Sequence, residues 1–125
     1  MNSPNAATLL FVYGTLKHGC SNHAQLAGAE FVGPARTPPG FRLHDLGGFP
    51  GLAPHADDRD GVVGEVWRVD GAGLARLDRF EGVAEGLYAR RPIALLPPFA
   101  GEKIAAYLPV APPVGRRDLG AEWVE

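Results

Sequence analysis

Cysteine pairs, long hydrophobic runs and an excess of charge of either sign are all missing from this chain. The single cysteine, Cys20, excludes an internal disulfide and suits a reducing compartment, so we expect a cytoplasmic protein. No apolar run approaches the roughly 20 residues that a membrane span needs, and residues 1–5 lack the positive charge with which a secretory signal begins. The net charge of −2 points to neither nucleic acid nor an anionic membrane as a partner.

Glycine and proline, by contrast, are abundant, with 17 Gly and 12 Pro among 125 residues. Both interrupt regular structure, so we expect many turns and short strands rather than long helices. The hydrophobic content of 46% is ordinary for a folded protein. The length fits a single domain over residues 1–125, with its core at about 8–110 and an irregular tail at 110–125.

Hydrophobic patterning predicts six strands and one helix. The strands are expected at residues 8–13, 29–37, 40–45, 61–70, 88–96 and 103–108. The helix is expected at 71–80, with Asp70 as its N-cap and Gly82 ending it. Two loops are expected, one over 14–28 with a helical turn near 22–26, and one over 47–60. Strands with a single helix predict an α+β fold, a small closed or nearly closed β-barrel with a helix added.

The most informative segment covers residues 10–19, where a hydrophobic strand runs into a turn that begins at Gly14. A strand that ends in a glycine turn leaves backbone N–H groups without ladder partners, and such groups can converge on an anion or an oxyanion. A plain hairpin turn is the commoner outcome of this pattern. The segment is not a P-loop, because no Gly-Lys-Ser/Thr follows at the needed spacing.

A second candidate feature is a carboxylate on the inner face of the expected helix. At about 100° per residue, Leu74 and Leu77 form the apolar stripe and Glu81 falls between them, whereas Arg76 and Arg79 point to solvent. A buried carboxylate is costly unless it is paired or its pKa rises, and the negative end of the helix dipole pushes the pKa further upward. A carboxylate with a raised pKa suits a general base near neutral pH.

The same residues also allow a purely structural interpretation. An inward Glu81 is more often the partner of a buried arginine or a backbone N–H group, and Asp78 is more often bonded to nearby backbone than catalytic. Arg90 could pair with either carboxylate. Tyr88 and Arg90 alternate on one strand face, and Tyr107 lies on the next strand, so all three could line a pocket whose base is Glu81.

Metal and thiol chemistry find little support in the sequence. The four histidines show no i, i+4 pairing on an expected helix, so we expect no metal site. Cys20 lies near His18 and His23, but a Cys–His couple needs an orienting partner and a fold that brings the side chains together.

Taken together, these features resemble the γ-glutamyl cyclotransferase-like family. Its first signature, Tyr-Gly-Ser/Thr-Leu at the end of a strand, matches residues 13–16, which Lys17 and Gly19 follow. Its second, Leu-Asp-x-x-Glu-Gly, matches 77–82, and a Tyr-x-Arg follows at 88–90. The resemblance covers about residues 8–110 and includes similar segments at 49–52 and 61–67.

The resemblance implies a small mixed β-barrel with a flanking helix, and an intramolecular aminolysis that needs neither metal nor organic cofactor. The α-amine of a γ-glutamyl group attacks its own γ-carbonyl, closing 5-oxoproline and releasing an amine or amino acid. Glu81 matches the family's general acid/base, and the N–H groups of the loop would hold the substrate's carboxylate or the oxyanion. The implied substrate-binding residues are Tyr13, Gly14, Thr15, Leu16, Tyr88 and Arg90.

The substrate is expected to be a small γ-glutamyl compound. Lys17, which follows the first signature, and Phe80, which precedes Glu81, make the sequence resemble the γ-glutamylamine branch of the family, which acts on γ-glutamyl-ε-lysine. Two alternatives stay open: a non-catalytic binder of a small amino-acid-like ligand in the same pocket, and a γ-glutamyl-removing enzyme whose amine product is unrelated to amino acids. The oligomeric state does not follow from the sequence.

Overall fold

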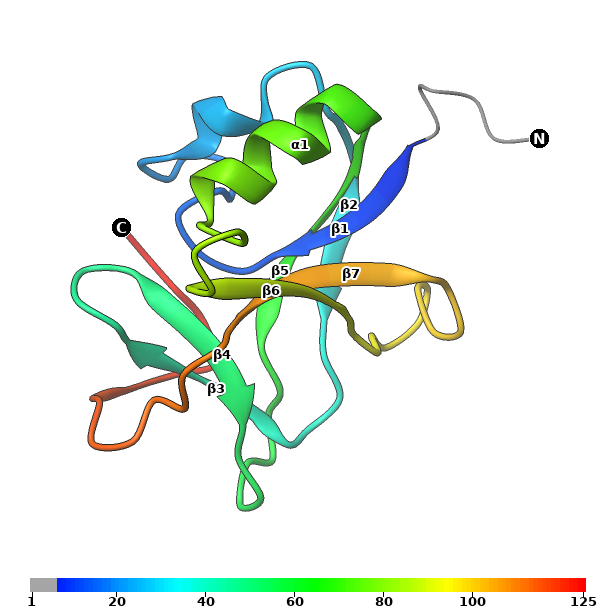
Figure 1. Ribbon diagram of the computed structural model, residues 1–125. Helices are drawn as coiled ribbons and strands as arrows, with labels where there is room; N and C mark the ends of the chain where they lie inside the picture. Colours follow the sequence, from blue (N-terminus) through cyan, green and yellow to red (C-terminus); the bar gives the residue numbers. More distant parts are fainter. Residues whose placement is uncertain (1–6) are drawn as a thin grey trace.

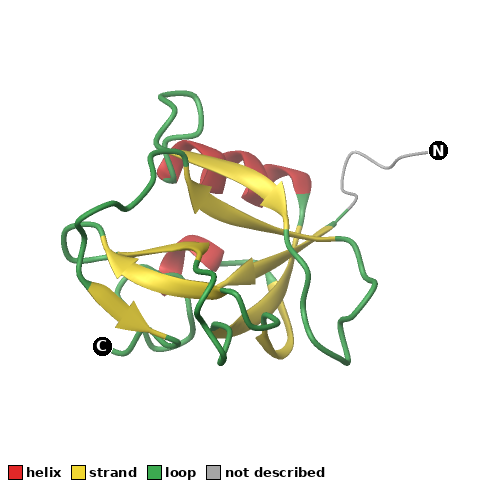
Figure 2. Cartoon of the chain, turned by 90° about the horizontal axis from the view of Figure 1, so that it is seen from below, coloured by secondary structure: helices red, strands yellow, loops and turns green. Residues whose placement is uncertain are grey.

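The computed structural model describes residues 7–125, which form two sheets, one α-helix and a short 3-10 helix (Figures 1 and 2). The larger sheet has the strand order β2-β5-β1-β7-β6 and the smaller has β4-β3-β8. The strands are β1 (Thr8–Val12), β2 (Glu30–Arg36), β3 (Phe41–Asp45), β4 (Pro50–Pro54), β5 (Val63–Val69), β6 (Tyr88–Pro92), β7 (Ile104–Pro109) and β8 (Asp118–Gly120). The helices are η1 (His23–Leu26) and α1 (Gly71–Phe80).

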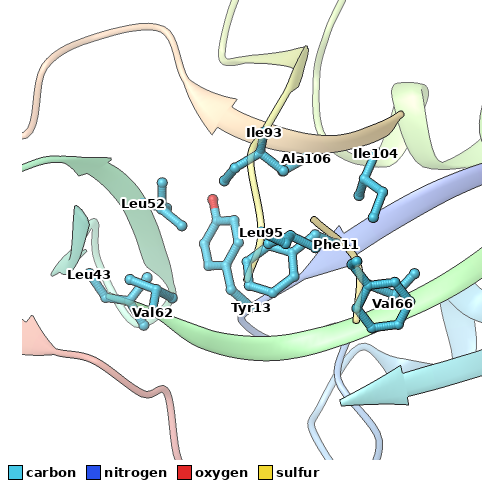
Figure 3. Close-up of a cluster of buried hydrophobic side chains, with 11 residues drawn as sticks. Phe11, Tyr13, Leu43, Leu52, Val62, Val66, Ile93, Leu95, Ile104 and Ala106 are labelled. Carbon is cyan, nitrogen blue, oxygen red and sulfur yellow. The ribbon is translucent and has the colours of Figure 1, made fainter. Parts of the chain in front are cut away.

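Strand β1 lies at the centre of the larger sheet, antiparallel to β5 and parallel to β7. Successive side chains of a strand point to opposite faces, and here both faces are buried. Phe11 and Tyr13 belong to the core cluster that includes Leu43 and Leu52 of the smaller sheet (Figure 3). Leu10 belongs to the cluster that α1 covers. The strand that precedes the glycine turn is therefore fixed from both sides.

Helix α1 forms where the sequence predicts it. The Asp70 side chain accepts a hydrogen bond from the N–H of Gly73 at 2.8 Å, which satisfies one of the donors left free at the helix start. Gly82 adopts φ +67°, a left-handed conformation that ends the helix and favours glycine. Leu77 is fully buried in the cluster beneath the helix, with Leu74 partly buried beside it.

Several expectations need correction. Strand β4 lies inside the segment expected to be a loop, and β8 lies inside the tail expected to be irregular. Strand β6 ends at Pro92 instead of continuing to residue 96. Over residues 7–125 the larger sheet is open, with β2 and β6 as its edges, so the α+β class is confirmed but a closed barrel is not.

None of the helices formed by residues 7–125 is long and apolar enough to cross a membrane.

Candidate active site

A cavity of about 300 Å³ opens where the loop after β1, the loop before β4, the end of α1 and the start of β6 meet. Figure 1 shows the chain leaving α1 and turning back into β6 on the side of the molecule where the loop after β1 lies. The lining residues are 11–16, 21–22, 48–50, 80–81, 87–88 and Tyr107. The loop residues 13–16 thus share one cavity with Glu81, although Leu16 and Glu81 are 65 positions apart in the sequence.

The loop after β1 offers unpaired donors to this cavity. Its carbonyl groups are used, since the Gly14 oxygen accepts from Lys17 N at 3.1 Å and the Thr15 oxygen accepts from Asn22 N at 2.8 Å. The Asn22 amide also donates to Thr15 Oγ1 at 3.0 Å. Within the described chain, none of the backbone N–H groups of Gly14, Thr15 and Leu16 donates a hydrogen bond. Unpaired backbone N–H groups beside a cavity are suited to an anion or an oxyanion.

Gly14 is required at its position by a close approach rather than by its backbone angles. A Cβ atom on this residue would lie 2.7 Å from Cγ of Pro50, closer than carbon atoms pack. Pro50 begins β4, so the loop after β1 lies directly against the smaller sheet. The glycine therefore lets the loop and β4 share the cavity wall.

Glu81 is the C-cap residue that directly follows α1, and its backbone N–H donates to the Leu77 oxygen at 2.8 Å. Its carboxylate lines the cavity, and it takes part in no hydrogen bond or ion pair with residues 7–125. Burial raises the pKa of this carboxyl from 4.5 to about 7, because desolvation disfavours the charged form. Glu81 can therefore accept and return a proton near neutral pH.

Asp78, the other inner carboxylate of α1, has a different environment. Arg90 donates to both of its oxygens, at 3.0 and 3.1 Å, and the Tyr107 hydroxyl donates to Oδ1 at 2.6 Å. Burial alone would raise the pKa of Asp78, but these donors lower it below its ordinary value. The same helix thus carries one paired carboxylate and one that is free to take up a proton.

Arg90 is not among the residues that line the cavity. Its guanidinium is occupied by Asp78, as the structural interpretation of the sequence allowed. We therefore assign it no direct contact with a ligand; through Asp78 it holds the side chain of Tyr107, which does line the cavity.

Three tyrosines form part of the cavity wall, and each hydroxyl donates to a protein oxygen. Tyr13 donates to the backbone of Tyr107 at 2.6 Å, and Tyr88 to the backbone of Pro50 at 3.2 Å. Burial raises the pKa of Tyr13, Tyr88 and Tyr107 above the ordinary value, so their hydroxyl groups stay protonated near neutral pH. These rings shape the cavity and leave Glu81 as its proton acceptor.

The loop is also held by residues far along the chain. Lys17 is buried and its Nζ donates to the Trp123 backbone oxygen at 2.6 Å. The backbone and hydroxyl of Ser21 donate to the carboxylate of Glu125 at 3.0 and 3.1 Å. We name these contacts the clasp.

Arg76 was expected to point to solvent. Its guanidinium instead donates to the carbonyls of Gln25 and Ala27, and so joins α1 to the end of η1.

Sequence reasoning did not assign several lining residues to the site: Ser21, Asn22, Phe49, Pro50, Phe80 and Leu87. Two signals were available, since Phe49-Pro50 belongs to a segment that matches the family and Phe80 directly precedes Glu81. A Cys20–His23 couple, for which the sequence offered little support, gains none from the structure, because burial raises the pKa of Cys20 and the ring of His23 is bonded to the Leu16 carbonyl. Among residues 7–125, no group of three His, Cys, Asp or Glu side chains could hold a metal ion.

Comparison with known proteins shows the family to which the sequence belongs. Residues 10–125 match the family described as gamma-glutamyl cyclotransferase, AIG2-like. A Vibrio cholerae protein with a provisional gamma-glutamylcyclotransferase name is 47% identical over 75 residues, 60% of this chain and 63% of that protein. YtfP of Escherichia coli, named a gamma-glutamylcyclotransferase family protein, is 37% identical over 82 residues, 66% of this chain and 68% of its own.

A solved structure agrees with these matches. The crystal structure of a mouse AIG2-like protein superposes with a TM-score of 0.70 at 29% identity, covering 82% of this chain and 76% of the mouse chain. The match to the Vibrio cholerae relative spans less than two thirds of that protein's length. The predicted resemblance to this family is confirmed, and the chain belongs to the gamma-glutamyl cyclotransferase, AIG2-like family.

Proposed function

We propose that this protein is a γ-glutamyl cyclotransferase that converts a γ-glutamylamine or γ-glutamyl-amino acid into 5-oxoproline and a free amine. One observation carries the proposal: the unpaired, desolvated carboxylate of Glu81 lines the same cavity as the unpaired N–H groups of Gly14, Thr15 and Leu16. A proton acceptor and a group of oxyanion donors are the two elements that an acyl transfer to an internal amine requires.

Glu81 acts first as the base. In a γ-glutamyl compound the α-ammonium lies beside a free carboxylate, so its pKa is above the value of about 8 of a peptide terminus and above the pKa of about 7 that burial gives Glu81. Glu81 therefore removes the proton against a difference in pKa, and the neutral amine that forms attacks the γ-carbonyl to make the C–N bond of a five-membered ring. Burial of the Glu81 carboxyl also lowers the polarity around it, which strengthens its electrostatic interactions with a bound substrate.

The loop stabilises the tetrahedral intermediate, whose oxyanion accepts hydrogen bonds from the N–H groups of residues 14–16. The protonated Glu81 first donates its proton to the departing nitrogen. The ionised carboxylate then takes the second proton from the ring nitrogen, and the old C–N bond breaks. Glu81 passes this second proton to the released amine, so both protons given up by the α-ammonium leave on the amine and Glu81 returns to its ionised form. No co-reactant is needed for this balance.

The test is the variant Glu81→Gln, which is nearly isosteric and cannot accept the proton. We expect its rate of 5-oxoproline release from a panel of γ-glutamyl compounds to fall by about 10²–10⁴-fold. Glu85→Gln is the matched control, because Glu85 is exposed on the turn after α1 and does not line the cavity. Equal activity of wild type and Glu81→Gln would refute the catalytic role. Binding of γ-glutamyl compounds by both proteins without any turnover would indicate a ligand-binding protein.

A further inference from the structure

The mouth of the cavity carries three large apolar side chains that are exposed to solvent. Phe49 and Phe80 are each 42% exposed and Leu87 is 63% exposed, and all three also line the cavity. They come from three separate segments: the loop before β4, the last residue of α1 and the turn before β6. We name them the apolar rim. Exposed apolar side chains that gather at the mouth of a cavity mark a surface for an apolar ligand group.

The charges of the residues that line the cavity also favour an apolar ligand group. Among its lining residues Glu81 alone carries a formal charge, and no lysine, arginine or histidine is present among them. In the proposed reaction, the loop N–H groups and the carboxylate of Glu81 serve the γ-glutamyl part of the substrate. A leaving group with its own carboxylate would meet no cation at the wall, and burying an unpaired charge is costly.

We infer, on the basis of the proposed function, that the preferred substrate is the γ-glutamyl amide of an uncharged apolar amine, whose hydrocarbon part lies against Phe49, Phe80 and Leu87. The γ-glutamyl end sits deep, beside Glu81 and the loop, and the scissile amide lies between this end and the apolar rim. The amine then leaves past the rim into solvent.

A matched set of four substrates tests this inference, each a γ-glutamyl amide with the same five-carbon chain. The amines are n-pentylamine, 1,5-diaminopentane, 6-aminohexanoate and the ε-amine of lysine, whose far ends are neutral, cationic, anionic and zwitterionic. We expect kcat/KM for the pentylamide to exceed each of the others by about tenfold, the scale on which apolar pockets discriminate. Leu87→Ser should reduce this preference severalfold, mainly through KM. Val114→Ser should leave it unchanged, because Val114 is 87% exposed and does not line the cavity.

The outcomes separate the inference from the function on which it rests. Turnover of all four amides with a charged amide equal or preferred overturns the inference and leaves the proposed function standing. If no amide releases 5-oxoproline, the proposed function fails, and calorimetric binding of the same four amides decides the inference. Tightest binding of the pentylamide supports an apolar ligand, and equal or absent binding overturns it. A wild-type dimer that Leu87→Ser dissociates, with amide preference unchanged, would overturn it by making the apolar rim a contact between copies.

Discussion

Replacing Glu81 by glutamine should stabilise the protein, but only at pH values at which the wild-type carboxyl ionises. Burial raises the pKa of Glu81 from 4.5 to about 7 in the folded state. A carboxyl with a raised folded pKa contributes its full stability below the unfolded pKa, and that stability is lost as the pH rises through the folded pKa. Each tenfold shift in an ionisation equilibrium equals about 1.4 kcal/mol, so the wild type should lose about 3 kcal/mol between pH 4.5 and 7.

The assay is urea unfolding of wild type and Glu81→Gln at intervals from pH 4 to 8. The difference in unfolding free energy should be small at pH 4, grow in favour of the variant, and level off above pH 7. At the plateau it corresponds to a rise of about 10 °C in Tm for a chain of this size. Comparing the two proteins at each pH cancels the titration of all other groups. A difference that does not change with pH would refute the reasoning, because it would mean that Glu81 is solvated or paired.

Three further outcomes follow from the site. The kcat/KM of the wild type should fall about tenfold per pH unit below pH 7, because Glu81 must be ionised to act as the base, and a profile that is flat between pH 5 and 7 would contradict that role. Gly14→Ala should cost about 1–3 kcal/mol of stability, since its Cβ would meet Pro50; the double variant with Pro50→Ala should cost less than the sum of the two single changes. Lys17→Met removes the donor to Trp123 and should speed amide hydrogen exchange over residues 14–22, whereas unchanged exchange there would show that the clasp does not order the loop.

The parts of the site that depend on local pattern could be predicted from the sequence. The bounds of α1, its Asp70 cap and the inward direction of Glu81 follow from the period of the helix and the chemistry of its first and last residues. The unpaired donors after β1 follow from a strand that runs into glycine. That these two features share a cavity does not follow from period or propensity, and here it came from their joint resemblance to a family.

Sequence reasoning missed the strands that form only because another strand, distant in the sequence or irregular in composition, pairs with them. Strand β4 both begins and ends in proline, a residue typical of loops, yet it forms because β3 offers a complete antiparallel partner. Strand β8 has only three residues and exists because the other edge of β3 is available to it. The sequence left open whether Arg90 pairs with Asp78 or Glu81, and the choice of Asp78 likewise depends on which face of β6 meets α1.

The clasp gives the assembly of the cavity an order in time. The Lys17 ammonium is bonded to a carbonyl 106 residues later in the chain, and Ser21 to a carboxylate 104 residues later. At about 5–20 residues per second, a ribosome completes these partners roughly 5–20 s after it has made the loop. The loop that follows β1 must therefore wait for the segment that contains Trp123 and Glu125 before its shape is fixed. A nascent chain can therefore hold Glu81 on a formed α1 while it still lacks a finished site.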